Sequence, residues 1–413
     1  MPAEFFIRRG QRLFAVAVCL TLAAAAHAGD ADRPALSLSG FGTLDMVHSG
    51  ERTADYSSSS MKASGAGYSG AWSPNVDSRL GAQLDATLGR WSAVLQVVSE
   101  QNLDGNYRPR VEWANVKYQV TPDLALRAGR IALPLFLMAD YRKVGYAYPW
   151  VRPPVELYGA LPITSSNGAD LTWRFASGEL RHTTQAFYGS DSRRLTQNIV
   201  LDARRTAGLS HTIEAGALTV RLSALTTELT LNIAEDLFQQ LQRVGGQGAV
   251  LAQRYAVDHK RASLASLGVS YDPGSWFVTA EAGHSHTSSF LGKNSALYAG
   301  GGVRFGALTP YVGYSRVRAD GSTYEEPPPV VPGRASILAN LNDNLNSLLE
   351  TIPAQSTVSA GLRWDVHNNV ALKAQWDRVT PRNGSRGTLI NTQPDFVSSH
   401  SLDVASLALD FVF

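Results

Sequence analysis

Cysteine is almost missing from the 413-residue sequence, which contains only Cys19. Because Cys19 lies in an N-terminal segment that we expect to be removed, the mature chain has no thiol. This excludes disulfides, cysteine-based metal sites and cysteine catalysis. An exported chain of this length must then gain its stability from a large core or from a membrane.

Excess charge of one sign is also missing, with 37 Lys and Arg against 35 Asp and Glu and a formal net charge of +2. Residues 1–28 contain three arginines and one glutamate, so the chain that follows them is close to neutral. Near-neutrality without a basic run argues against a nucleic-acid partner. We therefore expect none.

Long hydrophobic runs are absent after residue 28, and the mean hydropathy is −0.11. A helical membrane protein needs about 20 consecutive apolar residues, so this class is excluded. A membrane β-barrel remains possible, because only every second residue of each strand must be apolar.

The N-terminal segment combines three arginines, an apolar stretch over 13–26 and the tripeptide Ala26-His27-Ala28. This order predicts a secretory signal peptide over 1–28, which leaves 29–413 as the mature chain. The alternative is a retained membrane helix, for which the apolar stretch is short.

Strict alternation of apolar and polar residues fills most of the mature chain. In 401–413, every second residue from Ala405 to Phe413 is apolar, whereas Ser406 and Asp410 lie between them. Alternation of this kind predicts strands whose two faces meet different solvents. About sixteen such strands are expected, at 36–48, 79–88, 91–97, 111–120, 124–131, 168–176, 180–188, 205–213, 217–228, 261–271, 275–287, 295–305, 309–318, 357–366, 370–379 and 403–413.

The connections between these strands alternate in length. Short turns are expected at 89–90, 121–123, 177–179, 214–216, 272–274, 306–308 and 366–369. Longer segments separate them, at 49–77, 101–110, 132–167, 189–204, 229–260, 288–294, 319–356 and 380–401. Short turns at one end and long loops at the other are typical of outer-membrane barrels. Closure of such a barrel requires the last strand to pair with the first.

Aromatic residues gather beside the short turns, as at Trp91, Trp276, Phe305, Trp364 and Phe413. This position predicts an aromatic girdle at the boundary between lipid and water. The alternative is an ordinary core at the strand ends. In two of the long segments, leucine spacing over 231–243 and 335–350 predicts short helices.

In its architecture the sequence resembles the trimeric general porins of Gram-negative bacteria, through the sixteen strands, the long third loop and Phe413. The resemblance implies an all-β transmembrane antiparallel barrel in the outer membrane, with short periplasmic turns and long extracellular loops. The third loop, 132–167, would fold inward as the channel constriction, and Phe413 would be read as an assembly signal. Implied partners are two further copies of the chain, outer-membrane lipid, lipopolysaccharide, the barrel-assembly machinery and small hydrophilic solutes.

Two short motifs carry this resemblance further. "SRLG" at 78–81 resembles a motif of the second strand whose arginine lines the constriction, which assigns that role to Arg79. "AGR" at 128–130 assigns a basic-wall position to Arg130. Strict alternation would point Arg130 into lipid, so we expect either a bulge at Gly129 or a place in a subunit interface.

The third loop departs from the family's usual acidic composition, because basic residues accompany its carboxylates. We therefore expect a basic constriction and a weak preference for anions. The candidate constriction residues are Arg79, Lys117, Arg127, Arg130, Asp140, Arg142, Lys143, Arg152 and Glu156.

Passive diffusion of small hydrophilic solutes is the predicted function, and two alternatives stay open. One is a substrate-selective channel for a sugar or an anion, with the third-loop aromatics as a stacking track or merely as anchors of the loop. The other is a barrel enzyme, which is disfavoured because Ser210 and His211 lie on opposite faces of a strand. His284 and His286 share a face but lack a visible third ligand. We predict no catalytic residue, cofactor or metal site.

Overall fold

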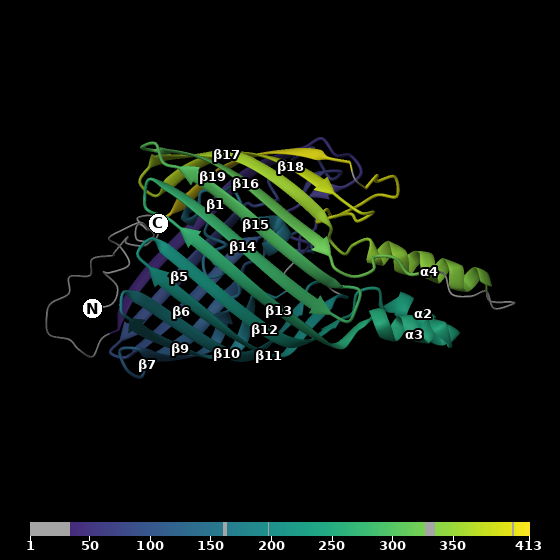
Figure 1. Cartoon of the computed structure of the whole chain (residues 1–413), viewed down its shortest axis with the longest axis horizontal. Coiled ribbons are helices and arrows are strands. Elements are labelled where there is room, and N and C mark those ends of the chain that lie inside the picture. The colour runs from purple at the N-terminus through teal and green to yellow at the C-terminus, as the bar shows by residue number, and fades with distance from the viewer. Residues whose placement is uncertain (1–33, 160–162, 197, 327–334, 399) are drawn as a thin grey trace.

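The computed structural model describes residues 34–159, 163–196, 198–326, 335–398 and 400–413. The predicted signal peptide lies outside them. Sixteen long strands form a closed barrel in which each strand is antiparallel to both neighbours (Figure 1). They are β1 (Ala35–Ser49), β5 (Arg79–Leu88), β6 (Trp91–Glu100), β7 (Arg110–Gln119), β8 (Leu124–Ala132), β9 (Ser165–Ser177), β10 (Leu180–Arg194), β11 (Val200–Ala215), β12 (Leu218–Leu231), β13 (Val257–Tyr271), β14 (Trp276–Thr287), β15 (Lys293–Val303), β16 (Leu308–Ala319), β17 (Gln355–His367), β18 (Val370–Pro381) and β19 (Leu402–Val412). The predicted strand number is confirmed.

The barrel closes where β19 pairs with β1, as predicted. At this seam Gly40 and Phe413 exchange two backbone hydrogen bonds, of 2.8 and 2.9 Å. The ring of Phe413 lies over Gly40, and the ring of Phe411 lies over Gly42. A Cβ atom at Gly40 would stand 2.2 Å from the Phe413 ring, so the close packing of this seam requires glycine.

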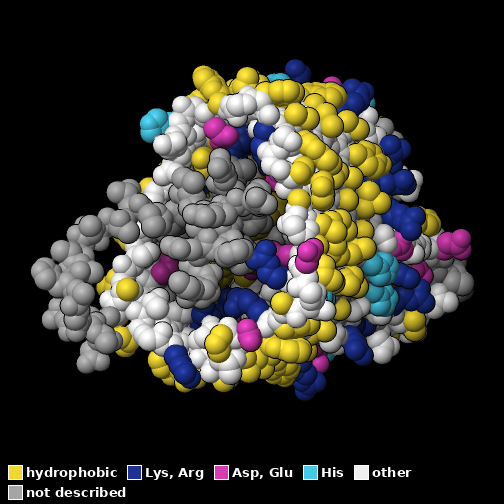
Figure 2. All heavy atoms as spheres, turned by 60° about the vertical axis from the view of Figure 1, so that its left-hand side comes forward, with side chains coloured by type: hydrophobic (Ala, Val, Ile, Leu, Met, Phe, Trp, Pro, Cys, Tyr) yellow, Lys and Arg dark blue, Asp and Glu magenta, His cyan; other side chains and the backbone are white. Residues whose placement is uncertain are grey.

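The two faces of the strands differ as the alternation predicts. In β19, Leu407 is 57 % exposed on the outer wall, whereas Ser406 and Asp410 are buried on the inner side. Figure 2 shows apolar side chains (yellow) covering much of the visible outer wall. No helix among the described residues is long and apolar enough to cross a membrane.

Short turns join the strands at one end of the barrel, at 89–90, 120–123, 178–179, 216–217, 272–275, 304–307 and 368–369. The turn at Gly178 has φ of +62°, the left-handed region that tight hairpins need. The predicted aromatics at this end lie on the surface, with Trp91 54 % and Phe305 64 % exposed. They therefore form a girdle and not a strand-end core.

The opposite end carries the longer loops and three helices, α2 (Glu235–Val244), α3 (Gln247–Tyr255) and α4 (Ala335–Leu349), as Figure 1 shows. Helices α2 and α4 lie within the predicted 231–243 and 335–350 segments to within one residue, whereas α3 was not predicted. The helices share one apolar core, with Leu241, Leu251 and Leu345 buried in it. The first loop adds three two-residue strands, β2 (Asp55–Tyr56), β3 (Ala66–Gly67) and β4 (Trp72–Ser73).

One predicted loop, 189–204, is mostly strand. Strands β10 and β11 continue through it, so only residues 195–199 connect them. The register shifts between Gly189 and Asp191 and again between Arg204 and Ala207. The alternation inverts in β11, where Leu201 and Ala203 are buried before the irregularity and Thr206 and Ser210 after it. In β10 the buried positions do not change, but its last residues, 190–194, are all polar, so no alternation marks them as strand.

Candidate channel constriction

The third loop, between β8 and β9, folds into the barrel, as the resemblance implied. Its described part contains a 3-10 turn, η2 (Gly145–Ala147), and a short helix, α1 (Val155–Tyr158). Trp150 of the loop packs edge-on against Phe277, Tyr298 and Tyr311 of the inner wall, with ring centroids 5.4–6.5 Å apart. This apolar contact fixes the loop against β14, β15 and β16, on one side of the lumen.

Cationic side chains of the wall bind the backbone of the same loop. Lys373 of β18 donates to the carbonyl oxygens of Gly145, Tyr148 and Trp150 at 2.7–2.8 Å. Its Nζ also lies 2.8 Å from the carboxylate of Asp410, and both side chains are fully buried. Irregular backbone inside a protein needs partners for its carbonyl groups, and Lys373 supplies three of them.

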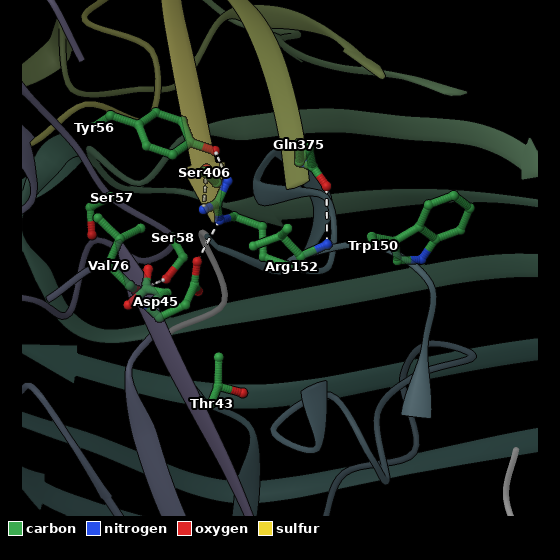
Figure 3. A network of polar contacts seen from close by, with 12 residues as sticks. Thr43, Asp45, Tyr56, Ser57, Ser58, Val76, Trp150, Arg152, Gln375 and Ser406 are labelled. Atoms are coloured by element: carbon green, nitrogen blue, oxygen red, sulfur yellow. Dashed lines mark hydrogen bonds and ion pairs between the residues drawn. The ribbon is translucent and has the colours of Figure 1, made fainter. Parts of the chain in front are cut away.

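Arg152 fixes the middle of the loop on both sides of the seam, to β18 and β19 and to Asp77, which precedes β5. Its guanidinium donates to Asp77 at 2.5 Å, to Asp377 at 3.1 Å and to Ser406 at 2.8 Å. Figure 3 shows this guanidinium close to Tyr56 and Ser406. Burial alone would raise the pKa of Asp77, but the positive charges of Arg152 and Arg79 hold it below its usual value.

Carboxylates make further attachments. Glu156 of α1 accepts hydrogen bonds from Ser315 and Gln355 at 2.6 Å each, and from Thr357. Glu281 of β14 accepts from Tyr158 at 2.5 Å and from the Leu137 amide at 2.6 Å. The loop is thus tied to β14 and to β16 through β19, and the opening lies on its other side.

That opening is a cavity of about 320 Å³ between the third loop and strands β5 to β8. Residues 58–62 of the first loop, both ends of the second loop and the end of β10 also line it. Its lining contains ten Lys and Arg side chains against three Asp and Glu, a formal excess of seven positive charges. The basic residues are Lys62, Arg79, Arg108, Arg110, Arg130, Arg142, Lys143, Arg152, Arg193 and Arg194; the acidic ones are Asp77, Glu100 and Glu112.

Five of the nine residues predicted at the constriction line this cavity: Arg79, Arg130, Arg142, Lys143 and Arg152. The other four lie elsewhere. Lys117 and Arg127 are paired positions of β7 and β8 closer to the short turns, where Arg127 binds Asp170 at 2.7 Å. Asp140 is half exposed and lies 3.9 Å from Arg221, and Glu156 is buried against the wall.

Arg130 reaches the lumen despite its unfavourable place in the alternation. Its Nη1 lies 3.0 Å from Asp191 and 3.2 Å from Asn167, and the side chain lines the cavity. In place of the expected bulge, β8 keeps an unbroken register through Gly129 and Arg130 with both neighbouring strands. Gly129 has φ of +124°, a conformation that favours glycine, and its missing Cβ leaves room for the Ala114 carbonyl.

Several lining residues were not predicted. Arg108 and Arg110 sit two residues apart in and after the second loop, and Arg193 and Arg194 stand at the end of β10. The adjacent Arg193 and Arg194 are a basic pair that the sequence does show. They were not predicted to line the channel because residues 189–204 were predicted to form a loop. Lys62 carries no such signal, since only the fold of the first loop brings it to the lumen.

The third-loop aromatics anchor the loop and do not form an open stacking track. Tyr146, Tyr148, Trp150 and Tyr158 are all buried, and Tyr158 is engaged by Glu281. Rings in these positions leave no face for a sugar to stack on.

The other candidate groups lie apart from the lumen chemistry. Ser210 points inward to Ser223, whereas the ring of His211 contacts His182, so Ser210 and His211 do lie on opposite faces. Among the described residues, no three His, Cys, Asp or Glu side chains are grouped so that they could hold a metal ion.

Comparison with known proteins gives matches to one family and one architecture. A family model described as Gram-negative porin matches residues 15–392. No curated protein sequence matches the chain. The outer-membrane channel DcaP of Acinetobacter baumannii shares the fold at 10% identity, with a TM-score of 0.54 and coverage of 92% of this chain and 97% of that one.

Two further solved structures show the same likeness. An anion-selective porin from Comamonas acidovorans aligns at 12% identity and a TM-score of 0.53, covering 92% of this chain and all of that one. The trimer form of OmpT, an outer-membrane protein of Vibrio cholerae, aligns at 10% identity and a TM-score of 0.51, again over 92% and 100% of the chains. At these identities the likeness concerns the fold alone.

Proposed function

The chain belongs to the Gram-negative porin family and is an outer-membrane channel for the passive diffusion of small hydrophilic solutes, and we propose that this channel prefers anions. The supporting observation is the lining of the cavity beside the third loop. Fixed charges at a narrow place raise the local concentration of ions of opposite sign. Seven excess positive charges around about 320 Å³ favour anions there.

The three lining carboxylates neutralise only part of this excess, and two of them are each shared by two cations. Asp77 is shared by Arg79 and Arg152. Glu112 is shared by Arg142 and Lys143. The paired groups therefore keep a net positive charge, and the unpaired arginines add to it.

The test is the reversal potential of the purified mature protein in a planar bilayer under a gradient of potassium chloride. We expect stepwise conductance and a reversal potential on the anion side. Because added salt screens fixed charges, the preference should weaken as ionic strength rises. A reversal potential on the cation side would overturn the proposed preference but not the assignment to the family.

We also propose that three copies form the working unit, as in the trimer form of OmpT that shares this fold. Chemical cross-linking of native outer membranes should give a species of three chains that dissociates on heating. A monomer as the largest species would argue against this assembly.

Lipid contact is proposed for a set of basic side chains on the outer wall near the long-loop end. Figure 2 shows dark-blue basic groups beside the yellow apolar surface. Arg316 and Arg318 are exposed on β16, and Lys293 is exposed on the adjacent β15. Cations at this height suit the phosphate groups of lipopolysaccharide. Loss of co-purifying lipopolysaccharide in Arg316→Gln would support this contact.

Three further assignments remain proposals. The segment 1–28 is a signal peptide, which N-terminal sequencing of the outer-membrane form tests. Phe413 is a signal for the assembly machinery, so its deletion should lower the amount inserted. The chain acts as a channel and not as an enzyme, which its membership of the porin family supports.

A further inference from the structure

Two buried cationic groups that line the cavity lack a hydrogen-bond acceptor among the described residues. They are Nζ of Lys62 and Nε of Arg130. We infer that the cavity is a binding site for a small oxyanion of the phosphate or sulfate class, and not only a region of positive potential. This inference rests on the proposed anion preference and makes it specific.

Lys62 comes from the first loop and is the more unusual of the two. The residue is 6 % exposed, yet its ammonium has no partner. The nearby carboxylate of Glu100 already binds Lys143. A buried ammonium that donates no hydrogen bond is costly, and an anion held in the cavity would remove that cost.

Arg130 approaches the cavity from the barrel wall. Its Nη1 is used by Asp191 and Asn167, and Asp191 is also bound by Arg193. The Nε–H stays unpaired although it is buried. A guanidinium with a free Nε–H beside a cavity is suited to an oxygen ligand, because its N–H groups point in fixed directions.

The remaining lining favours oxyanions over chloride. Phosphate and sulfate present several acceptor oxygens in fixed directions, which suits N–H groups that approach from the first loop and from the wall, whereas chloride responds mainly to the potential. The amide groups of Gln101 and Asn102 each use one N–H within the chain and keep a second one, and the Thr164 hydroxyl also lines the space. The cavity volume of about 320 Å³ admits a hydrated phosphate or sulfate ion.

The test uses the full mature channel in a planar bilayer, with chloride current measured while inorganic phosphate is added on both sides. We expect phosphate to reduce the chloride current and to do so saturably. Lys62→Met removes one orphaned cation with little change in shape, and it should weaken the apparent affinity for phosphate roughly tenfold, in line with the loss of one charged hydrogen bond. Arg130→Gln tests the second group in the same way.

Arg261→Gln is the matched control for Arg130→Gln, because it removes the same charge from an exposed position of β13 outside the cavity lining and should leave the block unchanged. Heat-modified mobility on gels confirms that each variant is folded. An anion-side reversal potential without saturable block would overturn the site and leave the anion preference intact. A cation-side reversal potential would remove the anion preference itself. If phosphate blocked the chloride current of Lys62→Met and Arg130→Gln as strongly as that of the natural chain, the site would also be overturned.

Discussion

Lys373 is the residue on which the position of the third loop most depends, and Lys373→Met tests that dependence. The substitution removes three hydrogen bonds to loop carbonyls. It also leaves the buried carboxylate of Asp410 without its cation, with the Thr43 hydroxyl still donating to it. Breaking a fully buried ion pair in this way costs about 3–5 kcal/mol. The Tyr148 carbonyl keeps its hydrogen bond from Arg363, whereas the loss at the Trp150 carbonyl adds about 1–3 kcal/mol unless water reaches it.

We expect the loop to loosen while the barrel stays folded, because the backbone hydrogen bonds between the strands do not involve the Lys373 side chain. We expect Lys373→Met to leave the heat resistance of the barrel almost unchanged, but to give noisier and larger single-channel currents. Proteases should also cut between residues 133 and 159 faster. Changed currents and faster cleavage with unchanged heat resistance would indicate loosening of the loop and not a loss of folding.

A double variant makes the reasoning stricter. In Lys373→Met with Asp410→Leu both charges of this pair are removed, so much of the current noise should disappear relative to Lys373→Met alone. If Lys373→Met showed the noise, conductance and cleavage rate of the natural chain, the loop would be held by its apolar contacts, and the role given to Lys373 would be refuted.

Three further predictions concern the seam, the wall and pH. Gly40→Val places side-chain atoms where the Phe413 ring lies, so it should lower the temperature at which the barrel unfolds on gels; equal stability would contradict the seam geometry. Arg79→Ala removes one lining charge and should move the reversal potential toward cations, whereas no movement would place Arg79 outside the ion path. Burial lowers the pKa of Lys62, so raising the pH removes its charge earlier than that of an exposed lysine. Anion preference should therefore fall on the alkaline side, and Lys62→Met should not show that step.

Prediction from the sequence succeeded where a local pattern carries the information. The alternation in β19 correctly predicted that Leu407 and Asp410 lie on opposite faces of the strand, and the residues around Gly178 correctly predicted a short turn. It failed at β11, because an irregularity after Arg204 shifts the pattern, and at the end of β10, because residues 190–194 are all polar. For the constriction, Arg79 was predicted by motif and by face, whereas Lys62 gave no local sign.

The sequence by itself determined the strand faces, the alternation of short and long connections and the near-neutral charge, because each is a property of neighbouring residues. Only the tertiary structure decided which wall receives the third loop. Arg152 meets Ser406 and Asp377 across more than two hundred residues, and Glu156 meets Gln355 across 199. A period of two fixes the face of a strand on which a side chain lies, but the partner across the lumen depends on barrel closure and loop packing, which no local pattern records.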